Sequence, residues 1–295
     1  MNRLSLFGFL FLLVASVFGA CAFQQITLVR SNLLMGHVPV NITLQFPSSQ
    51  KKKALEVTEE AYALAQSIEK KISAYQPDSE VSCLNQKAGD GFCTLSSETE
   101  KLLKFGLEIS DQTDHAFDLR FASLSKEGSH GKILIGKNRG KLAHPQTRIG
   151  VGSIGKGLII DSMINLIQSQ GFDKALVDAG GDLRALGGPW KVAIQKPGAA
   201  FGEFVQTFEI TNLALATSGN DEQPGHILDP RTGEKVIRNS SVTVMAKTHT
   251  FANALSTAFY VMGEKESTFY LKKFRGIQMI WAYPDGTVHS YFSTP

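Results

Sequence analysis

A glycine-rich segment near the middle of the chain carries the residue types that hold a phosphate group. Gly150, Gly152 and Gly155 have the spacing G-x-G-x-x-G, and residues 150–156 also match G-x-x-x-x-G-K, which ends at Lys156. The first pattern is typical of dinucleotide-binding folds, and the second is typical of loops that cradle nucleoside triphosphates. The two patterns imply different enzymes, so at most one of them can apply.

The context of the segment argues against both named motifs. A dinucleotide-binding fold needs a buried, continuously apolar strand before its first glycine, but the preceding residues KLAHPQTRI contain a proline and polar side chains. A triphosphate loop needs Ser or Thr after its lysine to bind magnesium, whereas Gly157 follows Lys156. Both matches are therefore interpreted as false positives.

The physical basis that the two motifs share still applies. Glycines allow the backbone to approach a ligand closely, and the N-terminus of a helix offers free N–H groups and a positive dipole. Lys156 adds a full positive charge at the same place. We therefore expect an anionic ligand, most simply a pyrophosphate. The alternative is a glycine-rich turn beside a solvated lysine.

Hydrophobic periodicity predicts the elements that position this segment. Ile160, Met163, Ile164 and Ile167 recur at helical spacing, so a helix should follow the glycines and end before Gly171. Other helices are predicted over residues 55–72, 96–110 and 250–262, and strands over 38–46, 132–136, 174–179, 182–187, 190–196, 204–217, 241–246, 277–283 and 287–292. These elements predict one α+β domain over residues 23–295, with mixed or antiparallel sheets and packed helices.

The composition and the net charge argue against some classes of partner. Of 295 residues, 43% are hydrophobic and 19% are charged, as in ordinary globular proteins, and the formal net charge of +3 is too small to indicate nucleic acid or a membrane surface as a partner. The run Lys51–Lys53 is interpreted as a solvated edge that precedes the first helix.

The first 22 residues are predicted to be a signal peptide rather than part of the fold. Arg3 supplies a positive charge, residues 4–17 are apolar, and small residues follow. Cleavage at Ala20-Cys21-Ala22 would release a soluble exported protein. The sequence Phe18 to Cys21 is also close to a lipobox, which would leave a lipid anchor on Cys21. With either cleavage, we expect an exported chain, in the bacterial periplasm or lipid-anchored to the membrane.

Cys83 and Cys93 would remain in the exported chain, as an even pair in an oxidising compartment. They lie close in sequence and can close a small loop by a disulfide bond. Two buried or half-buried free thiols are the alternative. Without a neighbouring histidine or a C-x-x-C spacing, they do not indicate a metal or redox site.

Several segments occur in the order of a known family. In chain order they are LMGHVPVNI, ISAYQPDSEVSCLN, TDHAFD, GSIGKGLIID, ALVDAGGDLRALG, ATSGN, HILDPRTG and ANALSTAFYVMG. On these segments, which span roughly residues 33–264, the chain resembles the bacterial FAD:protein FMN transferases, the ApbE-like family. GGD or TSG alone is a weak signal, but this many segments in order form a specific one.

The resemblance implies an activity and its partners. The family binds FAD and, with a divalent metal such as Mg²⁺, moves the FMN half onto a Thr or Ser of an acceptor protein, with release of AMP. Some members instead hydrolyse FAD or mainly bind it. Because the reaction is an attack on a pyrophosphate, catalysis should rest on positioning and charge neutralisation.

The resemblance also implies the roles of individual residues. The implied contacts to the flavin nucleotide are Met35, Tyr75, Ala116, Phe117, Asp118, Ser153, Lys156, Ser218 and Ile227. The implied metal positions are Gly155, Asn253 and Thr257. His226 is the best candidate to accept the proton of the incoming hydroxyl, because an imidazole titrates near neutral pH. A structural hydrogen bond is the alternative for His226.

Two acidic residues, Asp182 and Asp229, receive structural interpretations. Asp182 follows two glycines and is expected to fix a turn or to support a functional neighbour. Asp229 precedes Pro230 and is expected to start a tight turn.

The chain departs from the family pattern at the metal side. Asn253 stands where the family has an aspartate, and Gly150 stands where it usually has an acidic residue. A neutral amide should bind a hard dication more weakly than a carboxylate does. The flavin side differs too, because His115 replaces a glycine and Leu119-Arg120 replace Pro-Thr.

Three hypotheses follow from these observations. The first is an exported flavin transferase, with Lys156, His226 and Thr257 at the reaction centre. The second is an exported protein that binds or hydrolyses FAD and has lost metal-assisted chemistry. The third is a structural relative without a flavin. We rank the transferase first, because the lysine, histidine and threonine are all retained.

Overall fold

An eight-stranded antiparallel sheet forms the centre of the protein, with the strand order β1-β2-β6-β7-β10-β11-β12-β13. The computed structural model describes residues 24–123, 125–220 and 225–294. The predicted signal peptide, with its alternative lipid anchor at Cys21, lies outside the described residues. Two smaller sheets, β3-β5-β4 and β8-β9, complete the strands of the described chain.

The strands have the following bounds. The central sheet contains β1 (Gln25–Leu34), β2 (Val38–Pro47), β6 (Ala175–Ala179), β7 (Asp182–Leu186), β10 (Ala214–Ser218), β11 (Ser241–Ala246), β12 (Gln278–Ala282) and β13 (Val288–Phe292). The smaller sheets contain β3 (Cys93–Thr94), β4 (Ile133–Gly136), β5 (Arg139–Leu142), β8 (Trp190–Gln195) and β9 (Phe204–Ile210).

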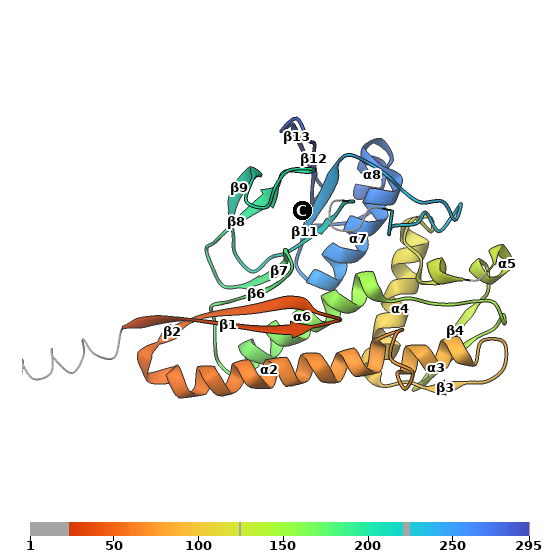
Figure 1. Ribbon diagram of the computed structural model, residues 1–295, viewed down its shortest axis with the longest axis horizontal. Helices are drawn as coiled ribbons and strands as arrows, with labels where there is room; N and C mark the ends of the chain where they lie inside the picture. The colour runs from red at the N-terminus through yellow and green to blue at the C-terminus, as the bar shows by residue number, and fades with distance from the viewer. Residues whose placement is uncertain (1–23, 124, 221–224, 295) are drawn as a thin grey trace, which may run out of the picture.

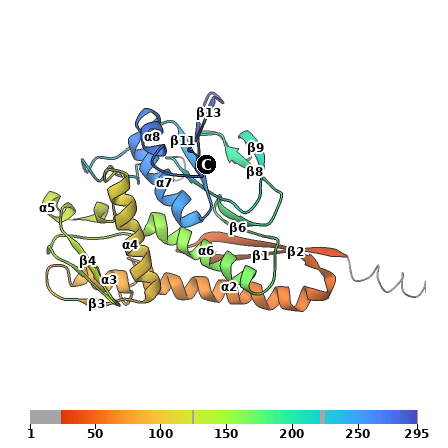
Figure 2. The ribbon, with the colours of Figure 1, turned by 180° about the vertical axis from the view of Figure 1, so that it is seen from behind.

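Helices pack against the central sheet, against the small sheet β3-β5-β4 and against one another. They are α2 (Lys51–Ile72), α3 (Glu80–Gln86), α4 (Ser97–Gln112), α5 (Lys126–Ser129), α6 (Gly152–Ser169), α7 (His249–Met262) and α8 (Glu264–Leu271), with the short 3₁₀ helices η1 (Ser48–Gln50) and η2 (Leu119–Ala122). Figure 1 shows α2 along the β1–β2 ribbon, with α6 and α7 at the centre. Figure 2 shows α4 beside α6 and α7 from the opposite side, and α4 packs against both.

The central sheet is buried on both faces where the β8–β9 hairpin covers it. Val244 of β11 belongs to the core beneath the helices, whereas Met245, the next residue, packs against Trp190 and Ile210 of the hairpin. Because successive side chains of a strand point to opposite faces, all six residues of β11 are buried. Double coverage explains why SVTVMA is almost continuously apolar.

The predicted α+β class and its antiparallel sheets are confirmed, and most predicted elements are present. Two details differ. β1 was not predicted, because it is an edge strand with mostly exposed residues and so lacks a clear alternation. Lys51–Lys53 do not precede the first helix but form its first turn, exposed to solvent, since the apolar face that begins at Ala54 holds the helix on the core.

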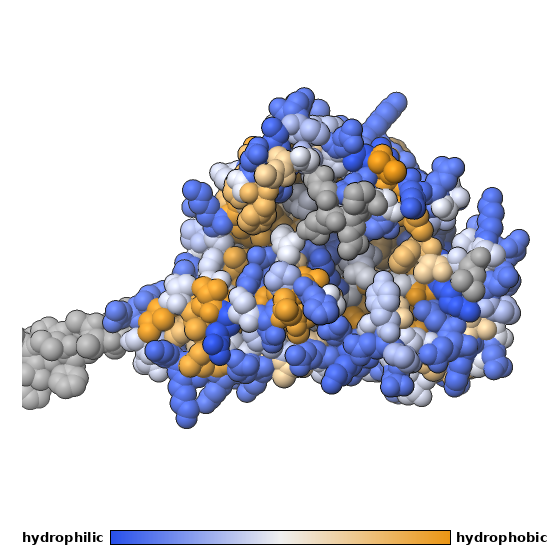
Figure 3. Space-filling view, in the orientation of Figure 1, coloured by the Kyte–Doolittle hydropathy of each residue, from blue (hydrophilic) through white to orange (hydrophobic). Residues whose placement is uncertain are grey.

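The surface is consistent with the mixed composition. The face in Figure 3 is largely hydrophilic, and its apolar residues occur in small separate groups. Within residues 24–123, 125–220 and 225–294, no helix combines the length and apolar character needed to cross a membrane.

Cys83 and Cys93 form a disulfide bond and are not free thiols, which was the alternative. The bond joins α3 to β3 across a sequence separation of 10 residues, with the two Cα atoms 6.1 Å apart. It ties the helix that carries Asn85 to the small sheet below it.

The disulfide predicts the thiol content of the exported chain. Without reductant, a chain that starts after residue 22 should show no titratable thiol when unfolded. Reduction should lower the free energy of unfolding by about 2–3 kcal/mol, the loop-entropy value for a loop of roughly 10 residues. Thiol titration in denaturant and urea unfolding with and without reductant test this. Two thiols in the non-reduced protein would contradict the bond.

Candidate functional site

The N-terminus of α6 is open to a ligand. The helix begins at Gly152, and its N-cap residue Val151 makes no side-chain hydrogen bond to the first turn. A Cβ atom added at Gly152 would meet no atom within 4 Å, so space remains in front of the first turn. Uncapped N–H groups and the helix dipole favour an anion at such a position. Ser153, half-buried in the same turn, adds a hydroxyl.

Helix α3 fixes the segment that leads into this turn. The Asn85 side chain donates from Nδ2 to the carbonyl oxygen of Ile149 (2.9 Å) and accepts from its N–H at Oδ1 (2.8 Å). One side-chain amide thus satisfies both backbone polar groups of the buried residue Ile149. The sequence motif that ends in Leu84-Asn85 therefore positions the glycine segment.

Lys156, one turn into α6, forms an ion pair with Asp182 at the start of β7. Its Nζ atom lies 2.9 Å from Asp182 Oδ2, and 27% of the lysine side chain is exposed. Asp182 Oδ1 also accepts from the N–H of Thr217 (3.2 Å). Burial alone would raise the pKa of the Asp182 carboxyl, but the neighbouring His249 ring and the Lys156 ammonium lower it to about 2. Asp182 therefore stays charged at neutral pH and pairs with Lys156. Of the two roles expected from the sequence, the structure thus has the carboxylate supporting a neighbouring residue.

His249, the first residue of α7, lies on the other side of Asp182. Its side chain is fully buried, and its Nε2 atom lies 3.7 Å from Asp182 Oδ1. Neither ring nitrogen has a hydrogen-bond partner within the part of the chain that the structure describes. Sequence reasoning missed this residue, because a single histidine in KTHTF matches no motif and its partner is distant in sequence.

Asp161 joins α6 to α7. Its carboxylate accepts from the backbone N–H groups of His249 (2.8 Å) and Thr250 (2.9 Å) and from the Thr250 hydroxyl (2.7 Å). It also pairs with Arg184 of β7. Asp161 thus caps the N-terminus of α7 from another helix, as a carboxylate at that position should. It was visible in the sequence as the last residue of GSIGKGLIID, without a role.

The two predicted metal positions on α7 lie one turn apart. Asn253 is 8% exposed, Thr257 is half-buried, and the Thr257 hydroxyl donates to the carbonyl oxygen of Asn253 (3.0 Å). Ser218 joins them indirectly, because its hydroxyl donates to Ser256 (3.0 Å), which donates to the same carbonyl oxygen (3.1 Å). The structure therefore brings Ser218 and the predicted metal pair into one cluster. Gly155 is buried on α6.

The side chains around this cluster do not fit a resident divalent cation. Asn253 offers a neutral oxygen, and the nearby carboxylates of Asp161 and Asp182 are already engaged with Arg184 and Lys156. No group of three or more His, Cys, Asp or Glu residues that could hold a metal occurs in residues 24–123, 125–220 and 225–294. Magnesium needs carboxylate ligands or substrate phosphates, and the carboxylates described beside this cluster, Asp161 and Asp182, are both engaged with cations.

Phe121 explains the second missing carboxylate. A Cβ atom added at Gly150 would lie 2.7 Å from Cζ of the Phe121 ring, so the ring fills the space that any side chain at position 150 needs. Phe121 belongs to η2, within the segment HAFDLRFASL that departs from the family pattern. The glycine at position 150 and the altered segment that contains Phe121 are therefore linked by one packing contact, although they lie apart in the sequence.

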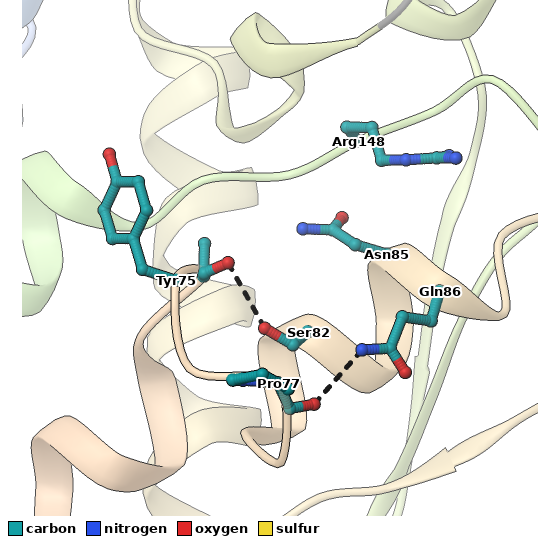
Figure 4. Close-up of a pocket in the computed structure, with 7 residues that line it drawn as sticks. Tyr75, Pro77, Ser82, Asn85, Gln86 and Arg148 are labelled. Atoms are coloured by element: carbon teal, nitrogen blue, oxygen red, sulfur yellow. Dashed lines mark hydrogen bonds between the residues drawn. The ribbon is translucent and has the colours of Figure 1, made fainter.

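Tyr75 marks a cavity on the α3 side of the site. The cavity has a volume of about 370 Å³ and is lined by Tyr75, Pro77, Ser82, Asn85 and Arg148, among others. Tyr75 is 96% exposed, and Figure 4 shows its ring and the Arg148 side chain on opposite sides of the cavity. An exposed aromatic ring beside a cavity of this size is suited to a flat ligand.

Met35 lies in the turn between β1 and β2. Its backbone N–H donates to Glu69 of α2 (3.0 Å), and its side chain packs against the core. The turn has left-handed φ angles at Met35, Gly36 and His37.

Ala116, Phe117 and Asp118 are buried. The Asp118 carboxylate binds Arg120 and accepts from the Ser110 hydroxyl (3.0 Å). Burial opposes ionisation of Asp118, but Arg120 outweighs it and lowers the pKa. His115, in place of the family's glycine, has a left-handed φ of 60°, and a hydrogen bond between its Nδ1 and Ser110 (2.8 Å) helps to hold it.

The HILDPRTG segment forms the opposite wall of a second cavity. This cavity has a volume of about 200 Å³ and lies between the segment from Arg120 to Ser129 and residues 228–233. Ile227 is buried, and His226 is exposed beside it. Asp229 starts the expected tight turn, since its carbonyl oxygen accepts from the N–H of Gly233 (2.7 Å).

Comparison with known proteins agrees with this geometry. The model of the ApbE family matches residues 35–281. An FAD:protein FMN transferase of Vibrio cholerae is 28% identical over 75% of this chain and 77% of its own length, and one of Treponema pallidum is 25% identical over 88% and 86%. The solved structure of the flavin transferase ApbE from Vibrio cholerae superposes with a TM-score of 0.74 at 25% identity, over 92% of this chain and 97% of that chain. The chain belongs to the ApbE family.

Proposed function

We propose that this protein is an exported flavin transferase that moves FMN from FAD to a Thr or Ser of an acceptor protein. The hydroxyl oxygen of the acceptor would attack the phosphorus of the FMN half, and the bond from that phosphorus to the bridging oxygen would break. AMP would leave with the bridging oxygen, and the proton of the hydroxyl would pass to His226. The observation that carries the proposal is the uncapped, glycine-rich N-terminus of α6 with the partly exposed Lys156 one turn behind it.

Each residue of the site has a proposed task. The N–H groups at Gly152 and Ser153 and the ammonium of Lys156 would neutralise the charge of the diphosphate. Tyr75, exposed beside the larger cavity, would hold the flavin ring. His226 is exposed and so accessible to an incoming hydroxyl. This arrangement provides positioning and charge neutralisation, which are the main requirements of phosphoryl chemistry.

Export is part of the proposal. The sequence of residues 1–22 supports it, and the Cys83–Cys93 disulfide suits an oxidising compartment. The lipid anchor on Cys21 stays an alternative to a free periplasmic protein.

A second candidate is a protein that binds or slowly hydrolyses FAD without transferring FMN. The observation that favours it is the side-chain set at the metal cluster, where Asn253 is neutral and Phe121 excludes a side chain at position 150. The two candidates differ in a single product: a transferase adds the mass of FMN to an acceptor, whereas a hydrolase releases FMN into solution.

The first prediction concerns phosphate recognition by Lys156. FAD should bind more tightly than riboflavin, because riboflavin lacks the diphosphate. Lys156→Ala should weaken FAD by roughly 10- to 100-fold, the range for a lost hydrogen bond to a charged group, and should change riboflavin affinity little. Lys53→Ala, on the exposed first turn of α2, is the control. Equal losses for both ligands in fluorescence titrations would reject the phosphate role.

The second prediction concerns Asn253 and magnesium. Purified protein would be incubated with FAD and a flavodoxin-like acceptor segment, with magnesium or with chelator, and the acceptor would be weighed. FAD binding by the wild type should change little with magnesium, and turnover should be slow. Asn253→Asp should increase magnesium affinity by at least about tenfold, because a unit charge near 4 Å contributes several kcal/mol at an intermediate dielectric, and should raise turnover. Fast, strictly magnesium-dependent turnover by the wild type would show that another group supplies the ligand.

The third prediction concerns the packing of Phe121 on Gly150. Gly150→Asp should destabilise the protein by about 1–3 kcal/mol, the usual cost of an overpacked site, and Phe121→Ala in the same chain should recover most of this loss. Gly152→Ala is the matched control, since an added Cβ there meets no atom within 4 Å. Urea unfolding of the wild type and of these three variants measures the changes. If Gly150→Asp is as stable as Gly152→Ala, the ring does not occupy that space.

A further inference from the structure

His249 is a buried polar side chain at the start of α7. It has no exposed surface, and neither Nδ1 nor Nε2 has a hydrogen-bond partner among the residues that the structure describes. Buried polar atoms are paired in almost every protein, because an unpaired one loses its hydration without compensation. An apolar residue would fill this position at lower cost, so the retained imidazole needs an explanation.

The position of the ring suggests what that explanation is. The backbone of His249 is held by Asp161, which accepts its N–H at 2.8 Å. Its Nε2 atom lies 3.7 Å from Oδ1 of Asp182, too far for a hydrogen bond but next to it. The other carboxylate oxygen of Asp182 lies 2.9 Å from Nζ of Lys156. Asp182 therefore lies between a lysine at hydrogen-bond distance and a histidine just beyond that distance.

Binding of a diphosphate changes the charge balance of this array. The Lys156 ammonium has three N–H donors, and contact with phosphate oxygens would share its charge between the phosphate and Asp182, whose side chain is only 10% exposed. A buried carboxylate that loses its cation is strongly destabilised. This cost would oppose FAD binding unless another donor replaces the lysine. His249 is close enough, because a shift of roughly 0.8 Å (3.7 Å less about 2.9 Å) would bring Nε2 to hydrogen-bond distance.

We propose that His249 is a positioning residue that takes over Asp182 when Lys156 turns toward the diphosphate of FAD. A neutral imidazole with its hydrogen on Nε2 is sufficient for this exchange, since that tautomer donates from Nε2. Without FAD the imidazole has no hydrogen-bond partner among the described residues, and with FAD bound it donates to Asp182. The inference rests on the proposed role of Lys156 in phosphate binding.

The test compares variants that keep or remove the donor at the Nε2 position. His249→Gln places an amide N–H near Nε2 and should bind FAD like the wild type. His249→Leu removes the donor and should weaken FAD on the order of tenfold, the size of a lost hydrogen bond to a charged group, with riboflavin affinity unchanged. Combining His249→Leu with Asp182→Asn should restore FAD affinity to that of Asp182→Asn alone, because a neutral amide no longer needs a replacement donor.

A merely structural histidine would give other results. It would lower the melting temperature and weaken FAD and riboflavin together, and Asp182→Asn would not rescue it. Such a pattern, or equal FAD affinities for the Leu and Gln variants, overturns the inference. If the Leu variant fails to fold, His249→Asn replaces it, because its shorter amide places the donor near Nδ1. FAD affinity of the Asn variant equal to that of Gln then overturns the inference.

A spectroscopic signal reports the exchange in the unmodified chain. In ¹⁵N-labelled wild-type protein, an Nε2–H resonance of His249 should appear downfield on addition of FAD and not on addition of riboflavin. Lys156→Ala is measured in parallel. If wild type does not prefer FAD to riboflavin, or Lys156→Ala does not remove the preference, the proposed function fails and this inference with it. If those results hold but the His249 variants match wild type, this inference alone fails.

Discussion

The close crossing of α6 and α7 is the constraint on which the site depends. A Cβ atom at Gly157 would lie 2.4 Å from the Cα of Thr250, so the two helices can approach this closely only because position 157 has no side chain. Asp161, one turn further along α6, then reaches the first N–H groups of α7 and pairs with Arg184 of β7. Two helices and a strand are thereby held in one arrangement, which sets where Lys156, Asp182 and His249 lie relative to one another.

In that arrangement, the partners of the Asp182 carboxylate lie at different distances from it. Lys156 pairs with the carboxylate, and Thr217 donates one backbone N–H to it. The Nε2 atom of His249 lies just beyond hydrogen-bond distance from Oδ1. A buried charge with one strong partner would resist the loss of that partner. In the proposed exchange, the neighbouring imidazole would lower this resistance, so the same lysine would stabilise the protein without ligand and bind phosphate with it. Stability and ligand binding would then use one set of side chains instead of competing for it.

The metal side of the site shows how separate departures in sequence can share one physical cause. The Phe121 ring lies beside Gly150, so a carboxylate at position 150 requires the ring to move. Asn253 removes a second charge from the same region, and the remaining carboxylates hold Lys156 and Arg184. Under the proposed function, the helix N-terminus and the lysine would then carry more of the neutralisation of the diphosphate. The described side chains therefore fit an anionic ligand better than a resident dication.

The sequence by itself determined the fold class, the helix that starts at the glycines, and the family. Periodicity located Ile160 to Ile167 on one buried face because helix burial repeats every three to four residues, and ordered motifs identified relatives over most of the chain. It missed β1, whose exposed edge position leaves no alternation to detect. It left Cys83 and Cys93 open as bonded or free. Only the tertiary structure decided that Phe121 blocks position 150 and that His249 faces Asp182. These pairs lie 29 and 67 residues apart in the sequence. Contacts between such distant residues depend on how the helices cross, and local sequence patterns do not encode that crossing.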